Sequence, residues 1–561
     1  MARRIPLAMS LILAVVLSRP LVAQVTYSRL LDAAKEPHNW LTYSGGYFGQ
    51  RHSGLRQIDA TNVKNLELKW IYQGTVIGNW QATPLVVDGV MYVSQRPNDV
   101  AALDAATGRA FWIYRHNTSP DHRACCGANN RGLAISGDTL YMGTLDARLV
   151  AIDTKSGRPR WSATVADMKA GYSVTLAPLV VKDKVIIGVG GGDLGIRGYI
   201  AAYNAETGKE VWRFYTIPGP GEPGHETWEK CPPASQAFCD DNAWMHGGAS
   251  VWVTGSYDPA LNMTYWGIGN AGPDYNPAQR PGDNLYAASV VALDADSGKL
   301  RWHYQFTPSD PYDYDSVQIP VLADITWNGG PVKAMLFANR NGFFYVLDRA
   351  TGRFLMGKPF VKVNWASGFD ERGRPIQTPQ PPGSPTYPGN QGGTNWYSPS
   401  YSPRTGLLYL SAWEGFATIF EGVAAPFQEG RYFVGGNSRN YAPVPDAPAM
   451  PTLRRGPINN WTDAVAHGAV IALDPSTGER KWTFPMTDIS DSGVLTTASD
   501  LLFTGGREGY FQALDARTGK LLWKASLGGQ MPSAPMTYAV DGKQYVATIA
   551  GQILAVFALR E

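Results

Sequence analysis

Residues 102–112, Ala102-Leu103-Asp104-Ala105-Ala106-Thr107-Gly108-Arg109-Ala110-Phe111-Trp112, form one copy of a pattern that recurs along the chain. In each copy an apolar pair ends a strand, an Asp and a Gly form a turn, and a Trp follows in the next strand. The Asp side chain can accept hydrogen bonds from turn amides, and Gly adopts the positive φ that such a turn needs. The Trp is a large anchor for packing against a neighbouring sheet.

Six further copies follow. Their key positions are Asp153, Gly157 and Trp161; Asn204, Gly208 and Trp212; Asp294, Gly298 and Trp302; Asp348, Gly352 and Met356 in place of Trp; Asp474, Gly478 and Trp482; and Asp515, Gly519 and Trp523. Units of this kind cannot bury their apolar faces alone, and radial repetition solves the problem. The wide gap after the Asp348 copy has room for a degenerate unit around residues 402–410. Seven clear copies and that unit predict an all-β, eight-bladed β-propeller with Trp-docking repeats.

The N-terminus reads as a signal peptide over residues 1–23, with a basic start, the apolar run Leu7–Leu17 and a small-residue cleavage site. The run is too short to span a bilayer, so the mature chain is expected to have no membrane span. We interpret residues 24–561 as one propeller domain, closed by a strand over 66–70 joining the C-terminal strands. Without the signal, 46 basic residues face 47 acidic ones, which gives no indication of nucleic-acid binding.

Two long insertions, 218–243 and 357–390, are rich in Pro and Gly and are expected to be surface loops over one end of the propeller. Four cysteines, Cys125, Cys126, Cys231 and Cys239, allow three disulfide connectivities. Adjacent Cα atoms lie about 3.8 Å apart, closer than ordinary disulfides prefer. Pairing of the neighbours with more distant cysteines is therefore one alternative. We favour Cys125 with Cys126, and Cys231 with Cys239, because the second pair lies in one loop.

An acidic stretch, residues 307–317, follows the strand expected over Leu300–Phe306. Its sequence, Thr-Pro-Ser-Asp-Pro-Tyr-Asp-Tyr-Asp-Ser-Val, is too rich in Pro and Asp to continue as a strand, so it is expected to be a loop. Its carboxylates Asp310, Asp313 and Asp315 repel one another unless a cation or an Arg neutralises them. On its own the stretch favours a solvated acidic turn, and the other parts of the chain shift the interpretation toward a metal and cofactor site.

Together, the adjacent cysteines, the Trp-docking repeats, Trp252 and the Asp313 loop resemble the pyrroloquinoline quinone (PQQ)-dependent alcohol dehydrogenases, the methanol/ethanol dehydrogenase family. The resemblance runs from about Trp40 to Val556. It implies that Cys125–Cys126 covers one face of PQQ, that Trp252 stacks on the other, and that the cofactor's polar groups contact further residues. Those residues are Gln81, Arg131, Thr175, Gly191, Gly192, Arg340, Asn395 and Trp396.

The same resemblance implies a metal ion bound by Asp193, Asn270 and Asp313, with Asp313 also acting as the catalytic base. Oxygen-only ligands suit a hard cation. Two positions depart from the family pattern, which usually has Glu at the places of Asp193 and Gln81. Asp315, two residues after Asp313, resembles the mark of lanthanide-dependent members and adds negative charge. We therefore expect a lanthanide at the site, with Ca²⁺ as the alternative.

The function expected from these residues is oxidation of an alcohol to an aldehyde or ketone by hydride transfer to PQQ. The chain has no Cys-x-x-Cys-His haem motif. The resemblance accordingly implies a periplasmic enzyme that passes electrons to a separate, soluble cytochrome c. The alternative is a non-catalytic propeller scaffold for protein binding. The sequence selects neither the preferred alcohol nor the oligomeric state, for which a homodimer is one option.

Overall fold

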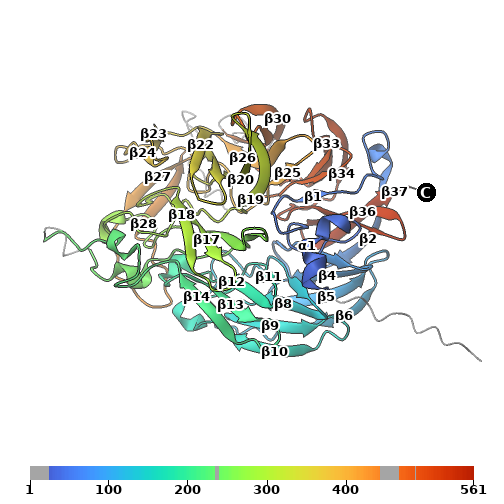
Figure 1. Cartoon of the computed structure of the whole chain (residues 1–561), viewed down its shortest axis with the longest axis horizontal. Helices are drawn as coiled ribbons and strands as arrows, with labels where there is room; N and C mark the ends of the chain where they lie inside the picture. Colours follow the sequence, from blue (N-terminus) through green and yellow to red (C-terminus); the bar gives the residue numbers. More distant parts are fainter. Residues whose placement is uncertain (1–24, 234–238, 442–465, 487, 561) are drawn as a thin grey trace, which may run out of the picture.

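The computed structural model describes residues 25–233, 239–441, 466–486 and 488–560. The predicted signal peptide, residues 1–23, lies outside them. Within them, eight antiparallel four-stranded sheets are arranged radially around a central axis, which confirms the predicted eight-bladed propeller (Figure 1). A short helix, α1 (Tyr27–Leu31), precedes the blades, and no helix of the described residues is long and apolar enough to cross a membrane.

In blades one to seven the four strands run from inner to outer in chain order, whereas blade eight takes its outer strand from the N-terminal part of the described chain. Blades one to four are β3 (Leu85–Val87), β4 (Val90–Gln95), β5 (Asp99–Asp104), β6 (Ala110–Tyr114); β7 (Ala134–Ser136), β8 (Thr139–Gly143), β9 (Arg148–Asp153), β10 (Pro159–Thr164); β11 (Leu179–Val181), β12 (Lys184–Gly188), β13 (Tyr199–Asn204), β14 (Glu210–Tyr215); and β15 (Ser256–Asp258), β16 (Met263–Gly267), β17 (Ser289–Asp294), β18 (Leu300–Gln305).

The remaining blades follow the same scheme. Blades five to eight are β19 (Val321–Trp327), β20 (Gly330–Ala338), β21 (Phe343–Asp348), β22 (Phe354–Pro359); β25 (Ser400–Ser402), β26 (Leu407–Glu414), β29 (His467–Leu473), β30 (Arg480–Met486); β31 (Leu495–Thr497), β32 (Leu501–Thr504), β33 (Tyr510–Asp515), β34 (Leu521–Ser526); and β35 (Met536–Val540), β36 (Lys543–Ala550), β37 (Ile553–Leu559), β2 (Leu66–Gln73). A short parallel strand, β1 (His52–Ser53), joins blade seven at β31.

The repeated tryptophans lock each blade to the next one. Trp112, on β6, packs on the turn of the following blade, where a Cβ added to Gly157 would lie 2.6 Å from its ring. Its Nε1 donates to the carbonyl oxygen of Thr154 at 3.0 Å, and Asp153 accepts the amide of Ser156 at 2.8 Å. The predicted docking is thus confirmed. The pairs are Trp70–Gly108, Trp112–Gly157, Trp161–Gly208, Trp212–Gly298, Trp302–Gly352, Met356–Gly478 and Trp482–Gly519.

The eighth blade is not where the sequence placed it. Residues 402–410 span the end of β25, a turn over 403–406 and the start of β26, and both strands belong to the same sheet as the β29 copy of the repeat. The eighth blade is instead made of the three C-terminal strands and β2, in which Leu66 pairs with Leu559. The prediction that residues 66–70 close the ring is therefore correct, whereas the separate unit around 402–410 is wrong. The long gap contains two hairpins, β23 (Ala366–Phe369) with β24 (Pro375–Gln377), and β27 (Ala417–Gly422) with β28 (Gly436–Tyr441).

The close fit of ring and turn should make these glycines hard to replace. Gly157→Ala is expected to lower the free energy of unfolding by about 2–4 kcal/mol, since it adds a Cβ in the left-handed region and overpacks Trp112. Gly406→Ala is the matched control, because Gly406 has a similar φ of +70° but nothing within 4 Å of an added Cβ. It should cost only about 1–2 kcal/mol. Urea unfolding of both variants measures the difference, and equal losses would contradict the role of the Trp contact.

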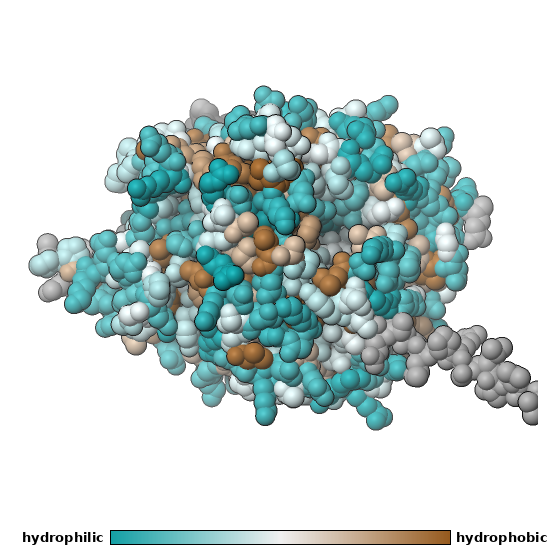
Figure 2. Space-filling model, viewed as in Figure 1, coloured by the Kyte–Doolittle hydropathy of each residue, from teal (hydrophilic) through white to brown (hydrophobic). Residues whose placement is uncertain are grey.

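The outside of the propeller is mostly polar. Outer strands alternate in exposure, as in β10, whereas the strands nearer the axis, such as β8, are buried throughout. Figure 2 shows hydrophilic residues over most of one face, with hydrophobic residues confined to small separate patches. The apolar area is therefore buried between blades, which leaves the loops at the two ends of the ring free to carry function.

Candidate active site

All of the predicted site residues lie at one end of the propeller. Because the four strands of a blade alternate in direction, the loops that join two blades and the loops that join the two middle strands open at the same end. The docking turns open at the other end. Loops between blades carry Gln81, Cys125, Cys126, Arg131, Thr175, Trp252, Asp313, Asp315, Asn395 and Trp396; loops between middle strands carry Gly191, Gly192, Asp193, Asn270 and Arg340.

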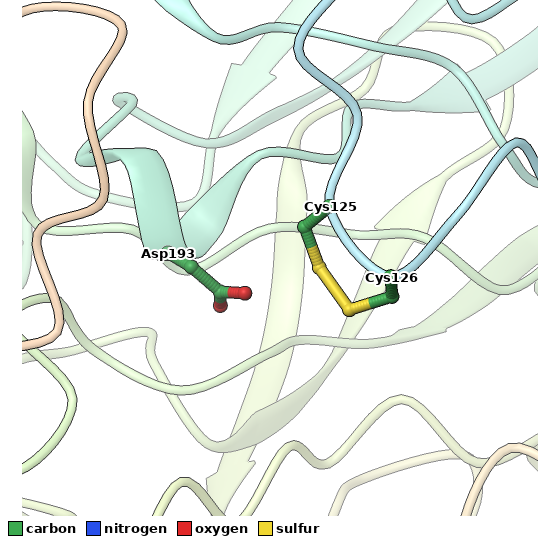
Figure 3. Close-up of side chains that lie close together, drawn as sticks. All are labelled: Cys125, Cys126 and Asp193. Carbon is green, nitrogen blue, oxygen red and sulfur yellow. A yellow bond between two sulfur atoms is a disulfide. The ribbon is translucent and has the colours of Figure 1, made fainter. Parts of the chain in front are cut away.

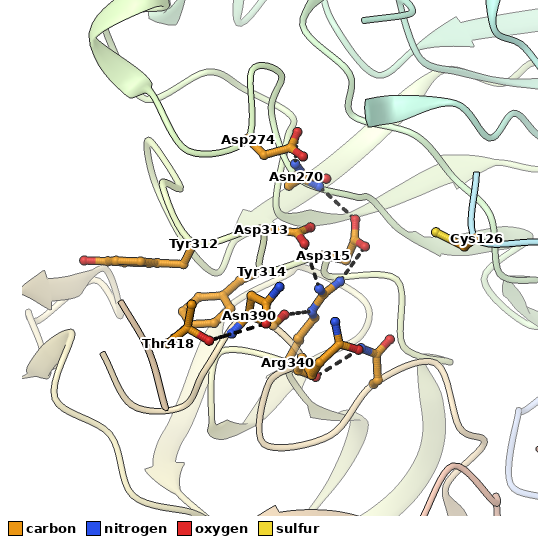
Figure 4. Close-up of polar contacts among 12 residues, drawn as sticks. Cys126, Asn270, Asp274, Tyr312, Asp313, Tyr314, Asp315, Arg340, Asn390 and Thr418 are labelled. Carbon is orange, nitrogen blue, oxygen red and sulfur yellow. Dashed lines mark hydrogen bonds and ion pairs between the residues drawn. The ribbon is translucent and has the colours of Figure 1, made fainter. Parts of the chain in front are cut away.

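Arg340 joins the two carboxylates of the acidic loop (Figure 4). Its Nη2 donates to Asp313 Oδ2 at 3.0 Å and its Nη1 donates to Asp315 Oδ2 at 2.6 Å, while its Nε donates to the carbonyl oxygen of Asn390 at 2.7 Å. The side chain of Arg340 is 5% exposed, and those of Asp313 and Asp315 are 18% and 10% exposed. The two carboxylates face the same partner, so the solvated-turn interpretation of this stretch is wrong.

The loop geometry around Asp313 depends on Asp310. The carboxylate of Asp310 accepts the backbone amides of Tyr312 at 2.9 Å and Tyr314 at 2.7 Å. Asp313 between them has a φ of 60°, a left-handed conformation that a non-glycine residue rarely adopts. Burial raises the pKa of Asp310 to about 6. Asp310 therefore shapes the loop from inside, a role that its acidic neighbours in the sequence did not reveal.

Asn270 connects the acidic loop to the neighbouring blade. Its backbone amide donates to Asp315 Oδ1 at 3.0 Å, and its side-chain Nδ2 donates to Asp274 Oδ1 at 2.9 Å. Gly269 allows this approach, since a Cβ there would lie 2.5 Å from Asp315 Oδ1. The buried Asp274 was not predicted from the sequence. An acidic residue four positions after Asn270, in a loop rich in Gly and Pro, is the signal that could have identified it.

Burial and mutual repulsion act together on these acids. Burial raises the pKa of Asp313 well above its usual range; the charge of Arg340 opposes the rise, and Asp315 and Asp193 add to it. Burial also raises the pKa of Asp274, and the nearby Asp193 and Asp313 increase the effect. Carboxyl groups that outnumber the guanidiniums beside them therefore favour the arrival of a positive charge.

Asp193 forms its tightest group with the two adjacent cysteines and not with the acidic loop. It sits in the short 3-10 turn η4 (Gly192–Leu194), with Gly191 in the left-handed region before it. Its carboxylate and the sulfurs of Cys125 and Cys126 lie within 4.8 Å of one another. Figure 3 shows the carboxylate pointing toward the disulfide. In the described part of the chain, no grouping this tight combines Asp193 with Asp313 and Asp315.

Several of the predicted cofactor residues gather around the guanidinium of Arg131. The Arg131 guanidinium lies over two indoles, 4.7 Å from the ring centre of Trp252 and 5.0 Å from that of Trp396. Its Nη1 donates to Thr175 Oγ1 at 3.0 Å. Asn395 accepts the amide of Trp396 at 2.9 Å through its own side chain. The fold therefore brings these five residues together, and a guanidinium beside flat rings suits an anionic aromatic ligand.

Two buried acceptors in this region also indicate a missing ligand. Gln81 Oε1 and Asn129 Oδ1 are shielded from solvent and have no hydrogen-bond partner among the described residues. Asn129 donates to the carbonyl oxygen of Cys126 at 2.8 Å, which places it at the base of the cysteine loop. Buried polar atoms of native proteins are nearly always paired. The residues present thus fit a polar group bound beside the cysteines.

Both predicted disulfides are present, Cys125–Cys126 and Cys231–Cys239. Replacing Cys125 and Cys126 with Ser is expected to lower alcohol oxidation clearly but to change thermal stability little, since so small a ring hardly restricts the unfolded chain. The control is the Cys231→Ser, Cys239→Ser double variant, whose longer loop should cost about 2–3 kcal/mol. Calorimetry and dye-linked assays separate the two effects. Intact mass showing free thiols at 125 and 126 in active enzyme would refute the proposed role.

Comparison with known proteins decides the family. A model of the PQQ-dependent glucose/ethanol/alcohol dehydrogenase β-propeller domain matches residues 40–377 and 484–546. The chain belongs to the quinoprotein alcohol dehydrogenases. A quinohemoprotein alcohol dehydrogenase, ADH IIB of Pseudomonas putida, is 39% identical over 91% of this chain and 73% of its own length. The prediction of an enzyme of this family is confirmed, and the scaffold alternative is dropped.

Other quinoprotein relatives carry a lanthanide in their names. A lanthanide-dependent methanol dehydrogenase of Methylacidiphilum fumariolicum is 36% identical over 93% of this chain and 86% of its own length. The solved structure of a europium-containing methanol dehydrogenase superimposes with a TM-score of 0.85 at 33% identity, covering 95% of this chain and 100% of that one. Family membership implies PQQ and a metal ion here, and it does not select the ion.

Proposed function

We propose that this quinoprotein oxidises an alcohol to an aldehyde or ketone with Asp313 as the base that accepts the hydroxyl proton. The observation that carries the assignment is the Arg340 fork, because it fixes Asp313 beside Asp315 at the end of the propeller where the cofactor residues gather. A positioned carboxylate contributes roughly 10²- to 10⁴-fold to such a proton transfer. PQQ, when bound, accepts the hydride from the alcohol carbon.

The chain's own residues perform the remaining tasks. Trp252, Trp396 and the Cys125–Cys126 pair are suited to hold a flat ring and keep water from it, and Arg131 and Thr175 would bind its carboxylates. Gly191 and Gly192 leave room beside it, and Gln81 and Asn395 offer polar contacts. Arg340 holds Asp313 in place before any substrate arrives. The ordered groups lower the reorganisation that the reaction would otherwise need.

A hard cation would be held by Asn270, Asp313 and Asp315, with Asp193 from the opposite turn, and it would supply Lewis acidity toward the cofactor. We propose a lanthanide, with Ca²⁺ as the alternative. The support is the position of Asp315, whose carboxylate accepts hydrogen bonds from Arg340 and from the backbone amide of Asn270 instead of facing solvent. The names of the lanthanide-dependent and europium-containing relatives agree with this choice.

The test is reconstitution of the metal-free protein with PQQ and either La³⁺ or Ca²⁺. Higher dye-linked alcohol oxidation with La³⁺ supports the proposal, and no quinone absorbance or oxidation with either ion overturns it. We also propose that the enzyme is periplasmic and passes its electrons to a soluble cytochrome c. If the purified enzyme oxidises its alcohol equally fast with and without added cytochrome c or dye, cytochrome c is not the required acceptor.

Asp315 is expected to matter more for the trivalent ion. Asp315→Ala should lower La³⁺-supported activity by about 10- to 100-fold, the usual loss when a partner of a metal site is removed. Asp315→Asn is the matched control, because its amide oxygen can still accept from Asn270 while its charge is gone. A parallel loss in both variants assigns the effect to charge. Undiminished La³⁺-supported activity in Asp315→Ala would return the site to Ca²⁺.

A further inference from the structure

Asp274 is a buried acid for which the proposed reaction has no use. It lies in the loop between β16 and β17, and the residue is 2% exposed. The ion pairs of the site join Arg340 to Asp313 and to Asp315 and leave Asp274 out. A carboxylate withdrawn from water is costly unless a cation or hydrogen bonds compensate it. Its position beside Asn270 therefore calls for an explanation.

The contact between the two side chains fixes the orientation of an amide. Asn270 Nδ2 donates to Asp274 Oδ1 at 2.9 Å and to the carbonyl oxygen of Ala271 at 3.2 Å. An ionised carboxylate only accepts hydrogen bonds, so the amide nitrogen must face it and the amide oxygen must face away. That oxygen lies 3.9 Å from where a Cβ on Gly192 would be, beside the turn that carries Asp193. Figure 4 shows Asp274 beside Asn270. Asp274 thus directs Asn270 Oδ1 toward the turn that carries Asp193.

The charges around this oxygen do not balance. Asp193, Asp274, Asp310, Asp313 and Asp315 supply five carboxylates, and the buried Arg280 and Arg340 supply two guanidiniums. When all are ionised, three negative charges remain uncompensated. A divalent ion would leave one of them, whereas a trivalent ion would leave none. Excess charge in a site shielded from water raises the energy of the complex.

We propose that Asp274 is a positioning residue of the metal centre, which orients Asn270 toward the ion and supplies a further carboxylate that makes the site select a trivalent over a divalent cation. The inference rests on the proposed metal-dependent function. It also accounts for Asp193, whose short side chain lies with Cys125 and Cys126. Asp193 contributes its negative charge poorly from one side of the metal site, and Asp274 supplies a negative charge from the other side.

The test is ion binding by the full-length, metal-free protein without PQQ. Eu³⁺ luminescence gives the Eu³⁺ affinity, and competition gives the Ca²⁺ affinity. Asp274→Asn keeps an acceptor for Asn270 but removes the charge. Because Coulomb energy is proportional to the charge of the ion, a roughly tenfold loss for Ca²⁺ should accompany a roughly thirtyfold loss for Eu³⁺. Asp274→Leu also frees the amide and should weaken both ions further.

Thermal unfolding distinguishes this role from a structural one. Removing a like charge should leave the metal-free Asp274→Asn protein at least as stable as the wild type, while the stabilisation by Eu³⁺ becomes smaller. Asp488→Asn is the control, since Asp488 is also a buried acid, 4% exposed, and its carboxylate accepts the backbone amide of Ile489 at 2.7 Å. It should leave both affinities unchanged.

The outcomes separate the role of Asp274 from the metal-dependent function itself. Wild-type binding of both ions, with equal losses or no loss in Asp274→Asn, overturns the inference and leaves the proposed function standing. If metal-free Asp274→Asn and Asp274→Leu are both less stable than the wild type but bind Eu³⁺ and Ca²⁺ with unchanged affinity, the inference is also overturned, because Asp274 would then be structural. If the wild-type protein binds neither Eu³⁺ nor Ca²⁺, the metal-dependent function itself fails.

Discussion

Asp313→Asn is expected to lower kcat by about 10²- to 10⁴-fold while PQQ remains bound. The amide keeps the shape of the side chain and an oxygen toward the site, but it cannot accept the hydroxyl proton. Its oxygen can still accept from Arg340, so the fork that holds the loop is largely preserved. The loss should therefore fall on the chemical step and not on cofactor binding.

Steady-state kinetics and the absorbance of bound quinone measure the two quantities separately. Asp296→Asn is a suitable control, because Asp296 lies in a docking turn at the other end of the propeller and is 48% exposed. Its exposed ion pair contributes little to stability, about 1 kcal/mol or less, and its loss should leave kcat unchanged. If the Asp313 variant keeps most of its kcat, another group takes the proton.

Arg340→Met is the second change with a large expected effect. Removing one partner of a buried ion pair typically costs about 3–5 kcal/mol, because a charge is left uncompensated. Here both Asp313 and Asp315 lose their partner. The metal-free protein should therefore unfold much more easily. An added cation can take over part of the compensation, so La³⁺ should restore more stability to this variant than it adds to the wild type.

The protein contains a matched control for this experiment. Arg349 is also a buried arginine, 2% exposed, and donates to Asp258 at 2.7 Å in blade four. Arg349→Met should lower the free energy of unfolding by a similar amount, but La³⁺ should not repair it, because Asp258 lies outside the metal site. Equal recovery of both variants would show that the ion stabilises the protein by some route other than the acidic loop.

The repeats made most of the fold predictable. A turn with Asp and Gly, followed by Trp, has a local physical cause, and the same cause acts in seven blades. The eighth blade has no such turn, so its strands gave no signal of the same kind. The residues around 402–410 drew the prediction instead, because they combine a turn with an apolar run. The number of blades was correct, although one was assigned to the wrong residues.

The sequence predicted which residues belong to the site, but not how they are arranged in space. Motif order identified Asp313, Asp315 and Arg340, and the fold brings them into contact. Burial was not readable from spacing, so Asp274 was missed and Asp310 had no assigned role. The distance of Asp193 from the acidic loop depends on how a three-residue turn is placed between blades. No local sequence pattern encodes that placement.

The pairing of β2 with β37 joins the N-terminal part of the described chain to its last strand and closes the ring. Glu67 and Arg560 form an ion pair although they are 493 positions apart, so the last strand must exist before the first can find its partner. Contacts this distant in sequence slow folding. Until they form, β37 presents an open edge on which another chain could pair. A cut in a docking turn would leave the β2–β37 pairing intact. Loss of the seven-residue strand β37 would instead open the ring and separate the blades that surround Asp313.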